Sequence, residues 1–243
     1  MRNDVRVEGI RRQGVRLLLA SAAAAIGALG VAGSAGAVTI TAGEECCEFI
    51  GSPFSQSAGI TAQLANPGAP NTAPHNVYSR SAGPDGGPLF FSTLVQAGET
   101  RAVRGTEYLS AGSYDFVCTL HNGMNGTLEV SGGQPTARPR ALPTVPAQSL
   151  ATVRKKGKVA VTVRSPGGSG PISLSVRTAG RAIGSLRTGP LPAGKSRKVS
   201  VTLSRQGKRL IAKGRSVKIE VRAVAEFGLP ATAKRVLRLG GGR

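Results

Sequence analysis

The chain is short of the residues that most often carry chemistry. Its 243 residues include no Trp, three Cys, two His and two Met, and the aromatic rings come from six Phe and three Tyr. So few metal-ligating side chains exclude multi-copper oxidases, di-zinc hydrolases and haem arrays, which all need more ligands. The shortage of rings argues against an aromatic-rich binding platform. No Gly-rich phosphate loop follows an expected strand, so nucleotide chemistry is unsupported.

Acidic residues are almost absent from the second half of the chain. Residues 134–243 hold 24 Lys and Arg but only two acids, Glu220 and Glu226, a net charge of +22. Residues 38–133 hold three Arg against eight acids, a net charge of −5, and eight of the nine Phe and Tyr. So abrupt a change in composition predicts a domain boundary. We therefore expect a first domain over 38–133, a Pro-rich linker over 134–148 and a basic domain over 149–239.

The first 37 residues have the pattern of a secretory signal. Arg11, Arg12 and Arg16 precede an apolar run over 17–31, and an A-x-A cleavage site ends at Ala37. We expect cleavage after Ala37, by the general or the twin-arginine route, and delivery to the periplasm, the cell envelope or the medium. The alternative is an uncleaved anchor, but the run is shorter than the roughly 20 residues that a span needs. We expect no membrane span in the mature chain.

Short period-2 patterns recur through the first domain. Strands are expected near 38–41, 60–64, 75–78, 100–103, 114–118 and 128–130, and residues 51–73 and 79–92 are otherwise rich in loop residues. Alternation places Tyr114, Phe116 and Cys118 on one face. No stretch sustains a helical period. Short strands between Gly- and Pro-rich turns predict an antiparallel sandwich or barrel.

The scarce ligands gather in one part of the sequence. Cys118, His121 and Met124 lie within seven residues, and His75 begins another expected strand. Two imidazoles, a thiolate and a weak axial thioether form the trigonal set of blue-copper centres, and such a set serves both Cu(I) and Cu(II). We therefore predict one copper ion per chain, bound by His75, Cys118, His121 and Met124. Gly123 would form the tight turn that returns His121 and Met124 to the metal.

Other interpretations of these residues have less support. A zinc site would more often use four Cys and His ligands and no Met. A Cys–His nucleophile pair would need an orienting Asn or Asp and an acyl-enzyme signature, and neither stands out. A single Met is usually core filler, but here the whole supply of His and internal Met falls in the proposed set. We expect no catalytic residue and no enzymatic turnover.

Several segments around these ligands resemble a known family. They are Pro74-His75-Asn76-Val77, Gly98-Glu99-Thr100, the run from Gly112 to His121, then Met124 and Gly126-Thr127-Leu128-Glu129-Val130. Over about residues 38–132 the chain resembles the plastocyanin- and amicyanin-like cupredoxins. The resemblance implies an eight-stranded Greek-key sandwich with copper near one end, three equatorial ligands and Met124 as the axial one. It also implies that the Asn76 backbone N–H bonds the Cys118 sulfur and that the His121 ring edge is the electron exit.

Cys46 and Cys47 are not explained by that resemblance. In an oxidising compartment they could form a vicinal disulfide or cross-link two chains. They could also form an accessory Cu(I) site beside Glu44, Glu45 and Glu48, or have no role. A disulfide between Cys46 and Cys47 is the favoured alternative.

Strand patterns return in the basic domain. Apolar residues alternate over 159–163, 172–176, 199–203 and 217–221, turns are expected at 166–168 and 189–190, and one or two helical turns at 204–213. Six or seven strands in this length predict an immunoglobulin-like or fibronectin III-like β-sandwich. The whole chain is therefore expected to be all-β, with a cupredoxin sandwich followed by this second sandwich. No titratable cluster in the second domain suggests catalysis.

The charge of the basic domain has three interpretations. It could hold an anionic cell-envelope polymer or lipid surface, it could dock onto an acidic redox partner or the chain's own acidic domain, or it could serve only solubility. We favour the anionic surface, because the net charge of +22 over residues 134–243 exceeds what solubility needs. Nucleic acid is not an expected partner, since export and the lack of interleaved aromatic residues argue against it.

Two functions follow from these features. The first is single-electron transfer between redox protein partners by an exported blue copper protein. The alternative is copper storage or delivery outside the cytoplasm, without redox turnover. A structural surface protein with a vestigial site is a weaker third hypothesis.

Overall fold

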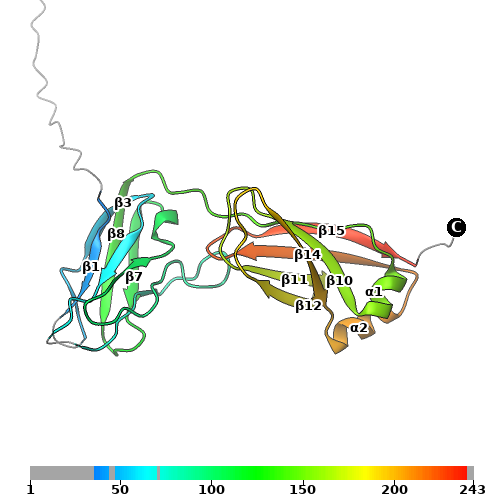
Figure 1. The fold of residues 1–243 in the computed structure, drawn as a ribbon, viewed down its shortest axis with the longest axis horizontal. Coiled ribbons are helices and arrows are strands. Elements are labelled where there is room, and N and C mark those ends of the chain that lie inside the picture. The colour runs from blue at the N-terminus through cyan, green and yellow to red at the C-terminus, as the bar shows by residue number, and fades with distance from the viewer. Residues whose placement is uncertain (1–35, 44–46, 70–71, 240–243) are drawn as a thin grey trace, which may run out of the picture. The chain divides into compact units, whose positions relative to one another are not determined.

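The computed structural model describes residues 36–43, 47–69 and 72–239 (Figure 1). The predicted export signal therefore lies almost entirely outside the described residues, and so does Cys46. All described residues belong to one compact unit, which spans 34–243. In the described ranges, no helix has both the length and the apolar character needed to cross a membrane.

Among the described residues up to 133, the chain forms eight strands in two four-stranded sheets. One sheet has the order β2-β1-β4-β6 and the other β3-β8-β7-β5. The strands are β1 Thr39–Ala42, β2 Phe49–Ile50, β3 Phe54–Ala58, β4 Ala62–Ala65, β5 Tyr78–Ser79, β6 Thr100–Val103, β7 Gly112–Val117 and β8 Asn125–Gly133, with a 3-10 turn η1 at Thr106–Tyr108. The pairs β1–β4 and β3–β8 are parallel, and the other pairs are antiparallel. The number of strands agrees with the one that the cupredoxin resemblance implies.

Aromatic rings fill the space between these two sheets. Phe116 of β7 is fully buried, and its ring centroid lies 4.9 Å from that of Phe49 and 6.2 Å from that of Phe90. Opposite Phe116 on β8 is Gly126, where an added Cβ would lie 2.5 Å from the Phe116 ring. The ring therefore occupies the space that a side chain on β8 would need. This close packing fixes the β7–β8 hairpin, whose connecting loop carries three of the predicted ligands.

The structure corrects three expectations for this part. The predicted sandwich is antiparallel, whereas β1–β4 and β3–β8 pair in parallel. Strand β3 lies within the segment expected to be rich in loop residues and pairs in parallel with β8. The sequence did not predict β3 because a polar residue, Gln56, occupies one of its inward-facing positions. The buried Gln56 side chain donates to the Ile60 carbonyl at 3.0 Å. Of the strand expected at 75–78, only residue 78 belongs to a strand, β5. His75 instead forms an isolated bridge with Val95.

The second part of the chain, described over residues 134–239, forms seven strands and two short helices. Its sheets have the orders β13-β10-β9 and β12-β11-β14-β15, with every pair antiparallel. The elements are β9 Leu142–Thr144, α1 Leu150–Lys156, β10 Lys158–Arg164, β11 Ile172–Thr178, β12 Arg181–Thr188, β13 Ser196–Thr202, α2 Arg205–Ala212, β14 Ser216–Ala225 and β15 Ala231–Arg238. Its core is aliphatic, built from alternate residues of the strands. The predicted all-β class is thus confirmed, while the immunoglobulin-like or fibronectin III-like assignment stays a prediction.

Local sequence explains most of these elements, with two corrections, at α1 and at β9. Serine side chains cap both helices: Ser149 accepts from the Thr152 N–H and Ser204 from the Gly207 N–H. Helix α2 lies where helical turns were expected, whereas α1 was not anticipated. Strand β9 lies inside the predicted linker. It contains Pro143, which lacks an N–H, and β9 is the edge strand of its sheet, the position where proline is tolerated.

The turn between β14 and β15 contacts residues of the first sandwich. Phe227 is buried, and its ring centroid lies 5.5 Å from that of Phe91 and 6.0 Å from that of Tyr108. The Phe227 N–H donates to Asp85 at 3.0 Å, and the neighbouring Glu226 pairs with Arg104. The only aromatic residue and one of the two acids beyond residue 133 therefore both serve this contact.

Candidate metal centre

Three of the four predicted ligands lie in the loop between β7 and β8. Cys118 follows the last residue of β7, and Met124 precedes the first residue of β8. The Cys118 N–H donates to the Met124 carbonyl at 3.0 Å, and the Met124 N–H donates to the His121 carbonyl at 3.3 Å. Gly123 has φ +84°, the left-handed conformation that a tight turn requires. The predicted turn is confirmed, and it closes the loop on itself.

His75 reaches the same place from the segment between β4 and β5. Its backbone pairs with Val95 in both directions, with N···O distances of 3.1 and 2.8 Å. The side chain is fully buried. Asn66 holds this segment in place, because its side-chain amide donates to the carbonyls of Ala73 at 2.8 Å and Val95 at 3.3 Å.

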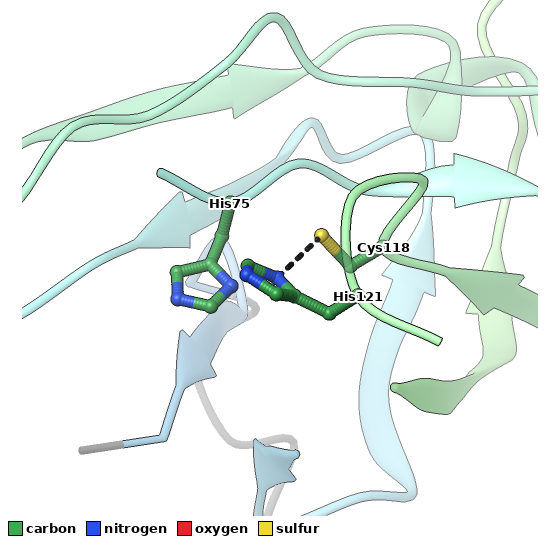
Figure 2. Close-up of side chains that lie close together, drawn as sticks. All are labelled: His75, Cys118 and His121. Carbon is green, nitrogen blue, oxygen red and sulfur yellow. Dashed lines mark hydrogen bonds between the residues drawn. The ribbon is translucent and has the colours of Figure 1, made fainter. Parts of the chain in front are cut away.

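Figure 2 shows the side chains of His75, Cys118 and His121 converging. One ligating atom from each, a ring nitrogen or the sulfur, lies within 4.8 Å of the others. The Cys118 Sγ lies 3.4 Å from the His121 Nδ1, and the two imidazole centroids are 4.6 Å apart. Within the described ranges this is the one group of three or more His, Cys, Asp or Glu placed closely enough to hold a metal ion.

Burial affects the protonation of one predicted ligand, His75. The pKa of His75 is lowered below its ordinary value, first because burial disfavours the charged imidazolium and second because His121 lies close by. A neutral imidazole is the form that binds a metal, so a lower pKa keeps His75 ready for binding at lower pH. Cys118 is 3% exposed and Met124 is 1% exposed, whereas His121 is partly exposed. The site therefore reaches solvent mainly through His121.

A pair of polar side chains ties the ligand loop to the His75 segment. The Asn76 Oδ1 accepts from the Thr119 N–H at 2.8 Å, and the Asn76 Nδ2 donates to the Thr119 Oγ1 at 2.9 Å. This clamp joins the residue after one ligand, His75, to the residue after another, Cys118. The hydrogen bonds described for Asn76 are these side-chain bonds, and the expected bond from its backbone N–H to the Cys118 sulfur stays a prediction.

The donor set suits a copper ion better than the alternatives. Two imidazoles and a thiolate are already gathered, and the loop that carries them also holds the buried thioether of Met124. Soft sulfur favours Cu(I), and imidazole serves Cu(II) as well. No carboxylate belongs to the described group, and the near-complete burial of Cys118 leaves its thiol little access to a substrate. A hydrolytic Cys–His pair is therefore poorly supported.

The predicted site residues have different outcomes. His75, Cys118 and His121 come together, and Met124 is tied to the other loop ligands through its backbone. Cys47 is in the disulfide form and has φ +94°. Because Cys46 lies outside the described residues, the pairing of these two cysteines stays a prediction.

Sequence reasoning missed two residues that position the site, Asn66 and Thr119. The Asn66-Pro67-Gly68 run is a turn signal. It does not disclose that the Asn66 side chain bonds Val95, which lies 29 residues further along. Thr119 stands between Cys118 and Leu120 with nothing in its surroundings to mark it, and its partner Asn76 lies 43 residues away.

Comparison with known proteins gives a limited result. No protein-family model matches the chain, and no curated protein matches it. Among solved structures, the reduced Cu(I) form at pH 4 of an amicyanin mutant is 20% identical over 40% of this chain and 83% of its own, with a TM-score of 0.33. Amicyanin from Paracoccus versutus is 25% identical over 39% of this chain and 81% of its own, with a TM-score of 0.31. TM-scores this low do not assign a function, so the interpretation of the site depends on its own side chains.

Proposed function

We propose that this chain is a carrier of single electrons that holds one copper ion on His75, Cys118 and His121, with Met124 as a fourth donor. The observation that carries the proposal is the convergence of two imidazoles and a thiolate within 4.8 Å. A bound copper ion would exchange one electron with a redox partner, alternating between its cuprous and cupric forms. The expected export signal would place this carrier in the periplasm, the cell envelope or the medium.

The protein's part is to hold the donors in place and to shield them. Buried Phe116 and the Asn76–Thr119 clamp fix the loop, so the ligands move little when the charge of the site changes. Small rearrangement favours fast electron transfer. Four protein donors leave no position reserved for a substrate, whereas catalytic metal sites keep one open. This arrangement favours a carrier over an enzyme.

Partly exposed His121 would be the point of contact with redox protein partners. Three of the four donors are buried, so His121 offers the shortest path from the site to the surface. Leu120 beside it is 50% exposed and supplies an apolar contact at the same place.

The test is to add one equivalent of Cu(II) to the metal-free full chain and then to reduce it with ascorbate. We expect an intense visible band from a thiolate–Cu(II) bond that bleaches on reduction and returns on reoxidation. Cys118→Ser should abolish the band. The matched control replaces both Cys46 and Cys47 with Ser and should retain it. A band that survives Cys118→Ser would refute the site, and a colourless copper complex that yields its metal to a chelator would instead support storage or delivery.

A further inference from the structure

The second sandwich has almost no internal counter-charge. Residues 134–239 hold 23 Lys and Arg, none of them buried, and only two acids. Both acids already have partners: Glu220 lies 3.4 Å from Lys234, and Glu226 pairs with Arg104 of the first sandwich. Within this described stretch, no carboxylate remains to neutralise the other cations. Repulsion among these Lys and Arg side chains destabilises a compact domain, and a bound polyanion would reduce that repulsion.

The cations cover one broad face of the sandwich. Six side chains project outward from the sheet β12-β11-β14-β15: Arg177, Arg187, Lys218, Arg222, Lys234 and Arg238. The one acid on this face, Glu220, stands between Arg177 and Lys234 on the two neighbouring strands. Short side chains, such as Ser173 and Ser175, lie between the cations and leave their charged ends accessible.

Cations also cover the opposite face and the helical end. Lys158, Arg164 and Lys198 project outward from the sheet β13-β10-β9. Helices α1 and α2, which lie beside each other in Figure 1, add exposed Lys155, Lys156, Lys208 and Arg209. The two sheets of a sandwich are about 10 Å apart, so these groups point in opposite directions from one core.

We propose that the second sandwich binds a flexible linear polymer with repeated phosphate groups, of the kind found in cell envelopes, and that this polymer wraps around both sheet faces. Phosphate groups suit clustered Lys and Arg, and release of their counterions drives such binding. A planar lipid bilayer could meet only one of the two faces. A flexible chain can follow the cations from one face around to the other.

The structure argues against single-stranded nucleic acid as the polymer. Binding of that kind combines a basic surface with exposed rings on which bases stack. The one aromatic residue of 134–239 is Phe227, which is 4% exposed and packed against Phe91 and Tyr108. Duplex DNA is no better suited, because the two helices have seven and eight residues and neither offers a long groove-reading surface.

The experiment measures binding of the full chain to inorganic polyphosphate over a range of salt concentrations. One variant removes three cations from the broad face, Arg187, Lys218 and Arg222, each to Gln. A second removes three from the opposite face, Lys158, Arg164 and Lys198, each to Gln. These six side chains make none of the hydrogen bonds or ion pairs described, so the fold should survive, and a thermal melt checks this. The control is Arg101→Gln in the first sandwich, where Arg101 is exposed and paired with Glu99.

Wrapping predicts that both variants lose affinity and that each lowers the salt slope. Each phosphate contact contributes about 0.7 to the slope of log K against log salt for a flexible strand. Losing three contacts should therefore lower the magnitude of that slope by about 2. Arg101→Gln should bind as the unaltered chain does. Tighter binding to vesicles of phosphatidylglycerol and phosphatidylcholine than to polyphosphate, or loss of affinity in only one variant, would overturn wrapping in favour of a planar surface. Equal or tighter binding of single-stranded DNA would overturn the polymer's identity, and binding indifferent to salt would overturn the proposal entirely.

Discussion

The first sandwich has an aromatic core, a net negative charge and all the proposed metal donors, whereas the second has an aliphatic core, a large positive charge and no His, Cys or Met. Both are built from two facing sheets. The shared architecture therefore does not determine the chemistry of either one. The two differ in where their distinctive residues lie. In the first sandwich, the aromatic rings and the proposed donors lie in the core and in the loop between β7 and β8. In the second sandwich, the Lys and Arg side chains lie on the exterior.

The cores differ for a related reason. Phe116 packs against Phe49, Phe54 and Phe90 beneath the ligand loop, where stiff rings hold the hairpin in one arrangement. In the second sandwich, Val, Ile, Leu and Ala fill the space between the sheets. The charged side chains of these sheets point outward, away from this core. Precise positioning would matter for the proposed four-donor site. It would matter less for the proposed binding of a polymer through charge.

The largest effect expected from this comparison comes from Phe116→Ala. Removing a fully buried ring should lower the free energy of unfolding by about 3–5 kcal/mol and abolish copper binding. The second sandwich should keep its affinity for polyphosphate. Differential scanning calorimetry of the full chain checks the stability, and Leu174→Ala, at a site 2% exposed in the second core, is the reciprocal variant. Equal destabilisation of both sandwiches by each variant would show that they unfold as one unit.

Phe227→Ala tests the contact between the two regions. It should cost about 3 kcal/mol, because the buried ring contacts Phe91 and Tyr108. We expect the calorimetric transitions of both sandwiches, which meet at this contact, to shift to lower temperature. Leu229→Ala is the control, since this residue lies in the same turn and is 42% exposed. Unchanged melting of Phe227→Ala would mean that the contact contributes nothing to stability.

Thr119→Val should have a smaller effect, confined to the first sandwich. The substitution keeps the shape of the side chain but removes the acceptor for the Asn76 Nδ2, which should cost about 1 kcal/mol. Looser positioning of the ligand loop should also shift the reduction potential of the copper-loaded protein, which protein-film voltammetry would measure. Thr93→Val changes an exposed threonine outside the clamp and serves as the control. A potential equal to that of the unaltered chain would show that the clamp does not position the loop.

The smallest effect expected is that of salt on stability. Raising the ionic strength from about 0.01 to about 1 M shortens the screening length from about 30 to about 3 Å, which weakens repulsion among the cations of the second sandwich. Its melting temperature should rise by roughly 4–8 °C at most, the shift that about 1 kcal/mol gives in a domain of this size. The first sandwich should change less. A fall in the melting temperature of the second sandwich would contradict the idea that repulsion weakens it.

Much of this organisation could be predicted from local sequence. Alternation located β6, β7 and β8, the abrupt change in charge separated two differently composed regions, and the scarcity of His and Met pointed to the ligand set. Cys118, His121 and Met124 were predictable because one tight turn around Gly123 brings them together, and such a turn depends on neighbouring residues alone.

Only the tertiary structure decided the rest, because those features depend on partners far away in the chain. His75 joins the site through a bridge to Val95 and through Asn66, and neither contact has a local signal. Strand β3 is stabilised by its pairing with β8 and by the hydrogen bond from the Gln56 side chain to the Ile60 carbonyl. Strand β9 can contain Pro143 because β9 lies at an edge of its sheet. The sequence by itself determined which side chains were available and which short segments would alternate. Packing and long-range hydrogen bonding decided which of them meet, since a strand or a ligand set is stable only when its distant partners are in place.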